Sequence, residues 1–102
     1  PQKKEILGLS LSTLTDELRE QLELDAKASG LVVQSVDEKS QAFEKGLRAG
    51  DIITEAGQEP VIQISDFEAR IAAAKEAGRK SLLLLVRRAG DPRFVALGLA
   101  DN

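Results

Sequence analysis

The chain has 102 residues, of which 42% are hydrophobic, 30% are charged and 3% are aromatic, and its formal net charge is −3 at pH 7. This balance predicts one folded domain with a mainly aliphatic core and excludes a disordered chain. We expect no nucleic-acid partner, because the net charge is acidic, and no membrane span, because the longest apolar run, 82–86, is far too short.

The first third of the chain predicts a strand, a helix and a second strand. Residues 6–11 alternate leucine with glycine and serine, which is the period of a strand with a glycine at its entry. Thr15 then caps a helix with acidic residues in its first turn, and this helical insert extends to Leu24. A glycine interrupts the pattern, and residues 31–36 follow as a strand.

The middle of the chain predicts a short helix and short extended pieces. Ser40 is a suitable cap for a helix that stops before Gly46. A glycine-aspartate turn at 50–51 then leads into a strand at 52–55. Residues 61–64 form a further short extended piece after a proline.

The last third predicts a longer helix and a β-hairpin. Ser65 and Glu68 have the spacing of a capping box, and the helix that they open should end near Gly78. Residues 81–87 and 94–97 are the hairpin strands, joined by a turn at 89–92. The whole order predicts an α+β fold, most simply a partly open antiparallel barrel or sandwich capped by helices.

Several kinds of chemistry are excluded by composition. The chain has no His and no Cys, so no Ser-His-Asp or Cys-His pair and no thiolate or three-histidine zinc site can form within it. The acidic pairs at 16–17 and 37–38 lie at helix starts and turns, where solvated surface is the better interpretation. We expect no catalytic residues, no metal site and no cofactor.

Three features together indicate a peptide site. A glycine between Leu7 and Leu9 can turn successive backbone N–H groups toward one point, which makes an anion cradle. The strand that follows can accept an extended peptide at its edge. A helix from Ser65 can pack beside that strand and leave a groove. Taken singly, each feature is more typical of an ordinary strand start or of a core-facing helix than of a ligand site.

The same residues carry a resemblance to a known family. Residues 6–9, Ile-Leu-Gly-Leu, are similar to the carboxylate-binding loop of PDZ domains, and residues 65–78 resemble the helix of the PDZ groove. Residues 40–53 resemble the bacterial PDZ pattern of a short helix, Gly-Leu, two residues, Gly-Asp and a buried strand. Residues 81–99 resemble the closing strands of the HtrA/Do (DegP-like) serine-protease subgroup. The resemblance implies a single PDZ domain over 1–102, with that subgroup's strand order.

The sequence departs from the bacterial pattern at a few positions. Ala49 stands where proline is common, Phe43 stands where a smaller residue is common, and residues 55–58 replace a common Val-Asn-Gly turn. These departures do not change the expected fold.

The resemblance also implies the residues of the site. Backbone amides of Leu7, Gly8 and Leu9 would bind the terminal carboxylate of a peptide, which would add a strand along 9–12. The residues expected at the peptide groove are Ser10, Leu11, Ser12, Phe67, Ile71 and Ala74. The pocket for the last side chain would be lined by Leu7, Leu9, Leu11, Ile71 and Ala74. Phe67 would face the residue two positions upstream, or alternatively turn inward as core.

By the same resemblance, the chain is a regulatory, peptide-binding module of a periplasmic HtrA/Do-type protease that acts in protein quality control. It would be a fragment of a trypsin-like serine endopeptidase, and in particular its C-terminal PDZ domain. Its partners would be the C-termini of peptides or misfolded proteins, the protease domain and sister PDZ domains, within a homo-oligomer. Two alternatives stay open: an oligomer-assembly domain with a largely unused groove, or a PDZ domain of another bacterial protease or secretion protein.

Overall fold

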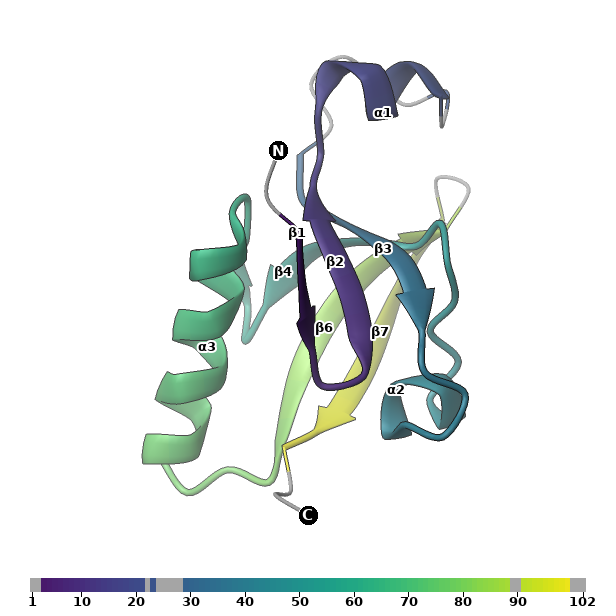
Figure 1. The fold of residues 1–102 in the computed structure, drawn as a ribbon. Coiled ribbons are helices and arrows are strands. Elements are labelled where there is room, and N and C mark those ends of the chain that lie inside the picture. The colour runs from purple at the N-terminus through teal and green to yellow at the C-terminus, as the bar shows by residue number, and fades with distance from the viewer. Residues whose placement is uncertain (1–2, 22, 24–28, 89–90, 100–102) are drawn as a thin grey trace.

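The computed structural model describes residues 3–21, 23, 29–88 and 91–99 (Figure 1). Within these residues, seven strands and three short helices follow one another along the chain. The elements in order are β1 Lys3–Ile6, β2 Leu9–Thr13, α1 Asp16–Gln21, β3 Leu31–Val36, α2 Gln41–Glu44, β4 Ile52–Ala56, β5 Glu59–Pro60, α3 Ile64–Glu76, β6 Ser81–Arg88 and β7 Asp91–Gly98.

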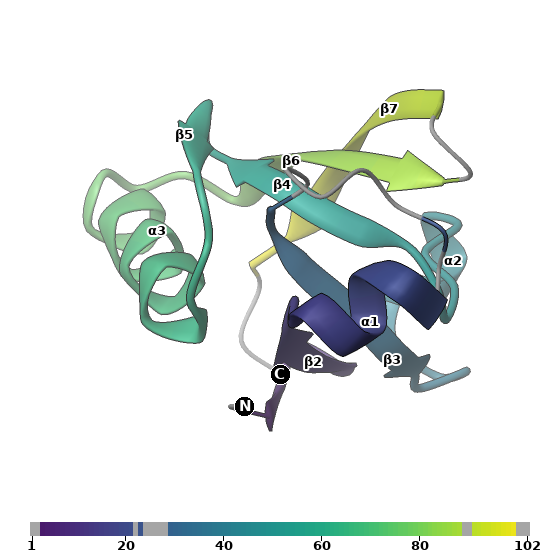
Figure 2. The same cartoon turned by 90° about the horizontal axis from the view of Figure 1, so that it is seen from above.

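All strand pairs of the sheet are antiparallel. The order is β1-β2-β3-β4-β6-β7, with β5 paired to β4, so β1 and β7 are the two ends of a sheet that is not closed. The strands form a strongly twisted sheet with α3 on one side and α1 and α2 beyond its other margins (Figures 1 and 2). The predicted α+β class and partly open antiparallel architecture are therefore confirmed.

The core is aliphatic except for one aromatic ring. Alternate residues of β6 (Leu82, Leu84 and Val86) are buried, as the period of a strand requires. The buried face of α3 packs onto this core and contributes Phe67, which is the largest fully buried side chain. The burial pattern thus places α3 over the sheet, beside the N-terminal strands.

A buried carboxylate explains the Gly-Leu-x-x-Gly-Asp stretch. The side chain of Asp51 is about 2% exposed and accepts two hydrogen bonds from Arg88, Nε to Oδ1 at 2.7 Å and Nη2 to Oδ2 at 2.8 Å. The Arg48 amide donates to the same carboxylate at 3.0 Å. The hydrogen bond that Arg88 donates to Asp51 is the largest cause that raises the pKa of Arg88. The loop before β4 is therefore fastened to the end of β6.

Several predicted elements are confirmed. Thr15 precedes α1 and its Oγ1 accepts from the Leu18 amide at 3.2 Å, while Ser40 caps α2 and accepts from the Phe43 amide at 3.3 Å. Gly78 follows α3 with φ of 75°, the left-handed backbone expected where a helix stops. The predicted extension of the first helix to Leu24, and the first half of the turn at 89–92, lie outside the described residues. The second half of that turn is wrong, because Asp91 and Pro92 already belong to β7 and pair with the end of β6.

The continuous strand predicted for residues 6–11 is wrong. The chain reverses at Leu7 and Gly8, whose φ angles are 54° and 84°, so that β1 and β2 form a hairpin. Positive φ at both central residues is the geometry of a type I′ turn, which matches the twist of paired strands. The leucines do alternate along the sequence, but Leu7 lies in the turn and only Leu9 and Leu11 lie in the strand that follows it.

The predicted start of α3 is also wrong in detail. The helix begins at Ile64, with Gln63 as its N-cap, and not at a Ser65–Glu68 capping box. The Asp66 carboxylate accepts from the amides of Ile62 at 3.1 Å and Gln63 at 3.0 Å. Ile64 is buried, and the N-cap lies two residues before the predicted Ser65, so the helix takes in the end of the extended piece predicted at 61–64.

This cap gives stability a pH dependence. The backbone hydrogen bonds from Gln63 and then Ile62 lower the pKa of Asp66 below its ordinary value. A carboxyl whose pKa is depressed by folding contributes stability above its unfolded pKa and loses it as the pH falls through the folded value. We expect the free energy of unfolding of Asp66→Asn to fall less than that of wild type between neutral pH and about pH 3.

Urea denaturation across this pH range measures the difference. Glu59→Gln, at an exposed strand position, removes the same charge without touching the cap and is the matched control. Parallel pH profiles for wild type and Asp66→Asn would contradict the expectation.

Candidate functional site

The candidate site is the edge of β2 that faces α3. One edge of β2 pairs with β3, and the other edge pairs with β1, which lies on the α3 side of β2 in both views (Figures 1 and 2). The pairs run from Ile6 opposite Leu9 to Lys3 opposite Ser12. The strand edge predicted to receive a peptide is therefore able to receive an antiparallel strand, and in this structure it pairs with the chain's own residues.

The turn that precedes β2 is seated against α2. The Gly8 carbonyl accepts from the Asp37 amide at 2.8 Å. A Cβ at position 8 would lie 2.4 Å from the Cβ of Ser40, so only glycine fits this close approach. Ser40 is itself held by a 2.6 Å hydrogen bond from its hydroxyl to the Asp37 carbonyl. The predicted carboxylate-binding residues thus form a tight, well-anchored turn.

The apolar residues predicted for the site come together in one cluster. Leu9 and Leu11 of β2 lie with Ile71 and Ala74 of α3 in the hydrophobic core, and Leu7 packs partly buried against it. Phe67 is fully buried in the same cluster. Its ring therefore belongs to the core, which is the alternative that the sequence left open, and in this structure Leu9 and Leu11 are equally buried.

The two serines of β2 do not face this cluster. Ser12 is buried, and its Oγ accepts a hydrogen bond from Gln34 Nε2 at 2.8 Å. Ser10 lies opposite Glu5 and is half-buried. Because successive side chains of a strand point to opposite faces, these residues contribute to a peptide site only through their backbone.

An ion pair connects β1 with α3 at the candidate site. Lys4 Nζ of β1 lies 2.5 Å from Glu68 Oε2 of α3, and both side chains are about half exposed. This contact was not predicted, because nothing in the sequence indicated that residues 3–6 would lie beside α3.

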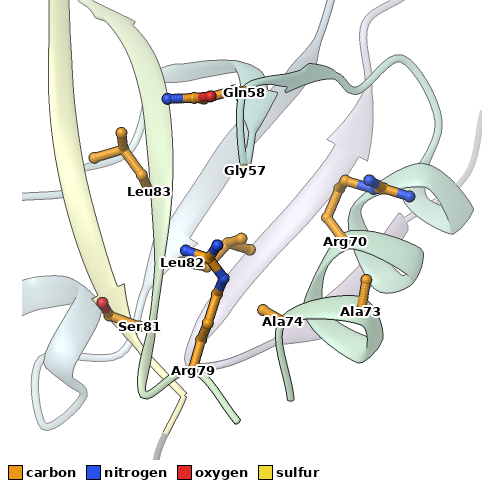
Figure 3. A pocket seen from close by; sticks show the side chains of 9 residues that line it. All are labelled: Gly57, Gln58, Arg70, Ala73, Ala74, Arg79, Ser81, Leu82 and Leu83. Atoms are coloured by element: carbon orange, nitrogen blue, oxygen red, sulfur yellow. The ribbon is translucent and has the colours of Figure 1, made fainter. Parts of the chain in front are cut away.

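A separate depression lies on another side of α3, between the helix, the turn after β4 and the start of β6 (Figure 3). Its volume is about 360 Å³. Arg79 reaches into it from the segment after α3, while Arg70 lies along its helix rim (Figure 3). Of the predicted site residues, it shares only Ala74, so it is not the predicted groove.

Among the described residues, no group of three or more acidic side chains is placed to hold a metal ion. No helix among them is long and apolar enough to cross a membrane.

Comparison with protein families gives one match over most of the chain. A family model described as "PDZ domain" matches residues 6–97. A "Probable periplasmic serine endoprotease DegP-like" of Bartonella henselae is 46% identical over 68 residues, which are 67% of this chain and 14% of that protein. A protein of the same description from Rickettsia conorii is 32% identical over 90 residues, or 88% of this chain and 17% of that protein. The chain thus spans less than a fifth of the length of these relatives.

Two solved structures have the same fold and contain peptides. The HtrA3 PDZ domain bound to the phage-derived ligand FGRWV matches with a TM-score of 0.75 and 27% identity, covering 95% of this chain and 86% of that one. The HtrA-type protease AlgW with a decapeptide matches with a TM-score of 0.68 and 24% identity, covering 94% of this chain and 29% of that one.

Proposed function

Because this chain belongs to the PDZ domain family, with DegP-like serine endoproteases among its relatives, we propose that it is the peptide-binding module of a periplasmic HtrA-type protease. The observation that carries the proposal is the β2 edge beside α3, which is shaped to pair with an antiparallel strand and does so with β1. Its ligands are the C-terminal or extended apolar segments of peptides and misfolded proteins, bound by strand addition.

Each part of the site has a chemical role in this proposal. The amides of Leu7, Gly8 and Leu9 bind the terminal carboxylate, since a turn with successive positive φ angles presents N–H groups to an anion. The backbone of β2 through Ser12 supplies the ladder for the rest of the peptide. The last side chain, which is apolar, packs toward Leu11, Ile71 and Ala74.

The chain acts as one domain, residues 1–102, of a longer protein in this proposal. The relatives are serine proteases, whereas this chain contains no His and no Cys. Proteolysis therefore belongs to another domain of the parent, with which this module and sister PDZ domains associate in a homo-oligomer. The periplasm is proposed as its location because the bacterial relatives are described as periplasmic.

The test is whether binding needs a free carboxylate. The probe is FGRWV, the peptide held by the HtrA3 PDZ domain. Amidation removes the charge that strengthens hydrogen bonds to backbone N–H groups, and one such bond is worth about 1.5–3 kcal/mol. We expect the amidated peptide to bind roughly tenfold or more weakly in calorimetric titration.

FGRWV with aspartate in place of its last valine is the matched control for the apolar pocket and is expected to bind weakly despite its carboxylate. Equal affinities for the free and amidated peptides would show that the turn at residues 7–9 is not an anion cradle.

The assembly alternative is favoured by a different observation. Leu83 and Phe94 are exposed on the outer face of β6 and β7, with Phe94 68% exposed, and a contact surface between subunits would bury this apolar area. A chain that binds no peptide and self-associates, with association abolished by Phe94→Ser, would favour assembly over peptide binding.

A further inference from the structure

We propose that β1 is an internal occupant of the peptide site, so that a peptide binds only after residues 3–6 leave the edge of β2. This inference rests on the proposed function and adds a regulatory step to it: the free chain holds its own site closed. The ligand class is unchanged, but its affinity is set by how often β1 opens.

The first argument is the direction of the strands. A peptide whose carboxylate lies at the turn of residues 7–9 must place its last residue beside Leu9 and its upstream residues toward Ser12. β1 runs the same way, with Ile6 opposite Leu9 and Lys3 opposite Ser12. A strand edge has one set of unpaired backbone groups, so β1 and a peptide compete for the same ladder.

The second argument is the use of the groove's side chains. Ile6 lies opposite Leu9, on the same face of the hairpin, and packs partly buried against the core. Lys4, two residues upstream, pairs with Glu68 of α3. β1 therefore contacts both the strand and the helix of the site, as a bound peptide with an apolar last residue would.

The third argument is that β1 is held weakly enough to open. β1 is only four residues long and lies at the end of the sheet, so among the described strands its only ladder is the one to β2, and leaving that edge breaks no other strand pairing. The ion pair between Lys4 and Glu68 is about half exposed, and exposed pairs contribute little. Gly8, in contrast, is held in place, because its carbonyl accepts a hydrogen bond from the Asp37 amide and its backbone packs closely against Ser40.

The consequence for affinity follows from the closed fraction. The apparent dissociation constant equals the intrinsic value divided by the open fraction, so a site that is closed about 90% of the time binds roughly tenfold more weakly. Removing β1 from the edge of β2 should therefore strengthen peptide binding by the same factor.

The decisive experiment locks the hairpin. Glu5 and Ser10 lie directly opposite each other in β1 and β2, and the chain has no other cysteine, so Glu5→Cys/Ser10→Cys can form a single cross-strand disulfide. We expect the oxidised variant to bind FGRWV at least about tenfold more weakly than the same variant after reduction. Wild type under the same oxidant and reductant is the control, and its affinity should not change.

A second variant opens the hairpin. Lys4→Pro removes a backbone donor from the β1 ladder and is expected to tighten FGRWV binding several-fold. Lys4→Ala keeps the backbone donor and removes only the ion pair, so its effect should be smaller. Thermal denaturation of each variant shows whether the rest of the domain stays folded.

Amide hydrogen exchange measures directly whether the peptide displaces β1 from the edge of β2. Upon addition of FGRWV, protection of the Lys4 and Ile6 amides should be lost, while Leu9 and Leu11 remain protected because the peptide replaces β1. FGRWV binding of equal strength to the oxidised, reduced and Lys4→Pro forms would overturn this inference and leave the proposed function standing. Failure of every form, Lys4→Pro included, to bind FGRWV would overturn the proposed function and the inference with it.

Discussion

Phe67→Ala is expected to lower the free energy of unfolding by about 3–5 kcal/mol, the usual cost of deleting a buried aromatic ring. The ring is fully buried where α3 packs onto the sheet, and its removal leaves a cavity that aliphatic neighbours cannot fill without moving. Since small domains have total stabilities of about 5–15 kcal/mol, this loss is a large share of the whole.

Urea denaturation measures this loss, and the matched control is Phe94→Ala. Phe94 has the same side chain but is 68% exposed, so its removal should change stability by no more than about 0.5 kcal/mol. The comparison also decides the role of Phe67. If the ring were a groove residue, Phe67→Ala would weaken peptide binding and leave stability near that of wild type.

Asp51→Ala is expected to cost about 2–4 kcal/mol. The carboxylate is buried and accepts from Arg88 twice and from the Arg48 amide, and removing one partner of a buried pair leaves polar groups without compensation. The estimate is below the full cost for buried pairs because the Arg88 side chain is about 40% exposed and regains water.

A double-mutant cycle with Arg88→Ala isolates the pair. We expect a coupling of more than about 1 kcal/mol, because both side chains belong to one hydrogen-bond network. Asp16→Ala is the control, because it breaks the exposed Asp16–Arg19 pair of α1 and should cost less than about 1 kcal/mol. Additive losses for Asp51→Ala and Arg88→Ala would contradict a buried, coupled pair.

Much of the fold could be predicted from the sequence, because the local signals for caps, turns and strands occur in segments whose apolar residues are buried. The short helix capped by Ser40, the Gly-Asp turn and the strand from Ile52 all lie where the sequence predicts them. The long helix and closing hairpin have clear periods and a glycine at the helix stop, so both lie where they are predicted, although the helix cap shifts by two residues and the last strand begins three residues early. In these segments local propensity and tertiary packing favour the same structure.

The missed features share a physical cause, which is dependence on distant contacts. A Leu-Gly pair lacks the Asn-Gly or Asp-Gly signal of a tight hairpin, and leucine rarely adopts the left-handed backbone that Leu7 has here. The α3 cap shifted because burial of Ile64 outweighed a serine cap, as tertiary context commonly does. The contact of β1 with α3 joins residues 64 positions apart, beyond any local pattern.

For the site, the sequence predicted which apolar residues of β2 and α3 face inward, but it did not predict how accessible these residues are to a peptide. Leu9, Leu11, Ile71 and Ala74 all belong to the hydrophobic core, because each lies on the inward face of its strand or helix, and their role in a peptide pocket stays a prediction. Whether a groove remains between β2 and α3 depends on what lies at the strand edge. That is a property of the N-terminal residues, whose sequence carries no motif.

The close approach of Gly8 to Ser40 also links two positions in evolution. A side chain at position 8 would overlap the Cβ of residue 40 and would also be strained by the φ of 84°, so a lineage that keeps this turn could change position 8 only at a cost in backbone strain and with glycine at position 40. That change would remove the hydroxyl that caps α2, and a serine cap is usually worth about 1 kcal/mol. We therefore expect substitutions at positions 8 and 40 to be rare or to occur together, although 31 residues separate the two positions in the chain.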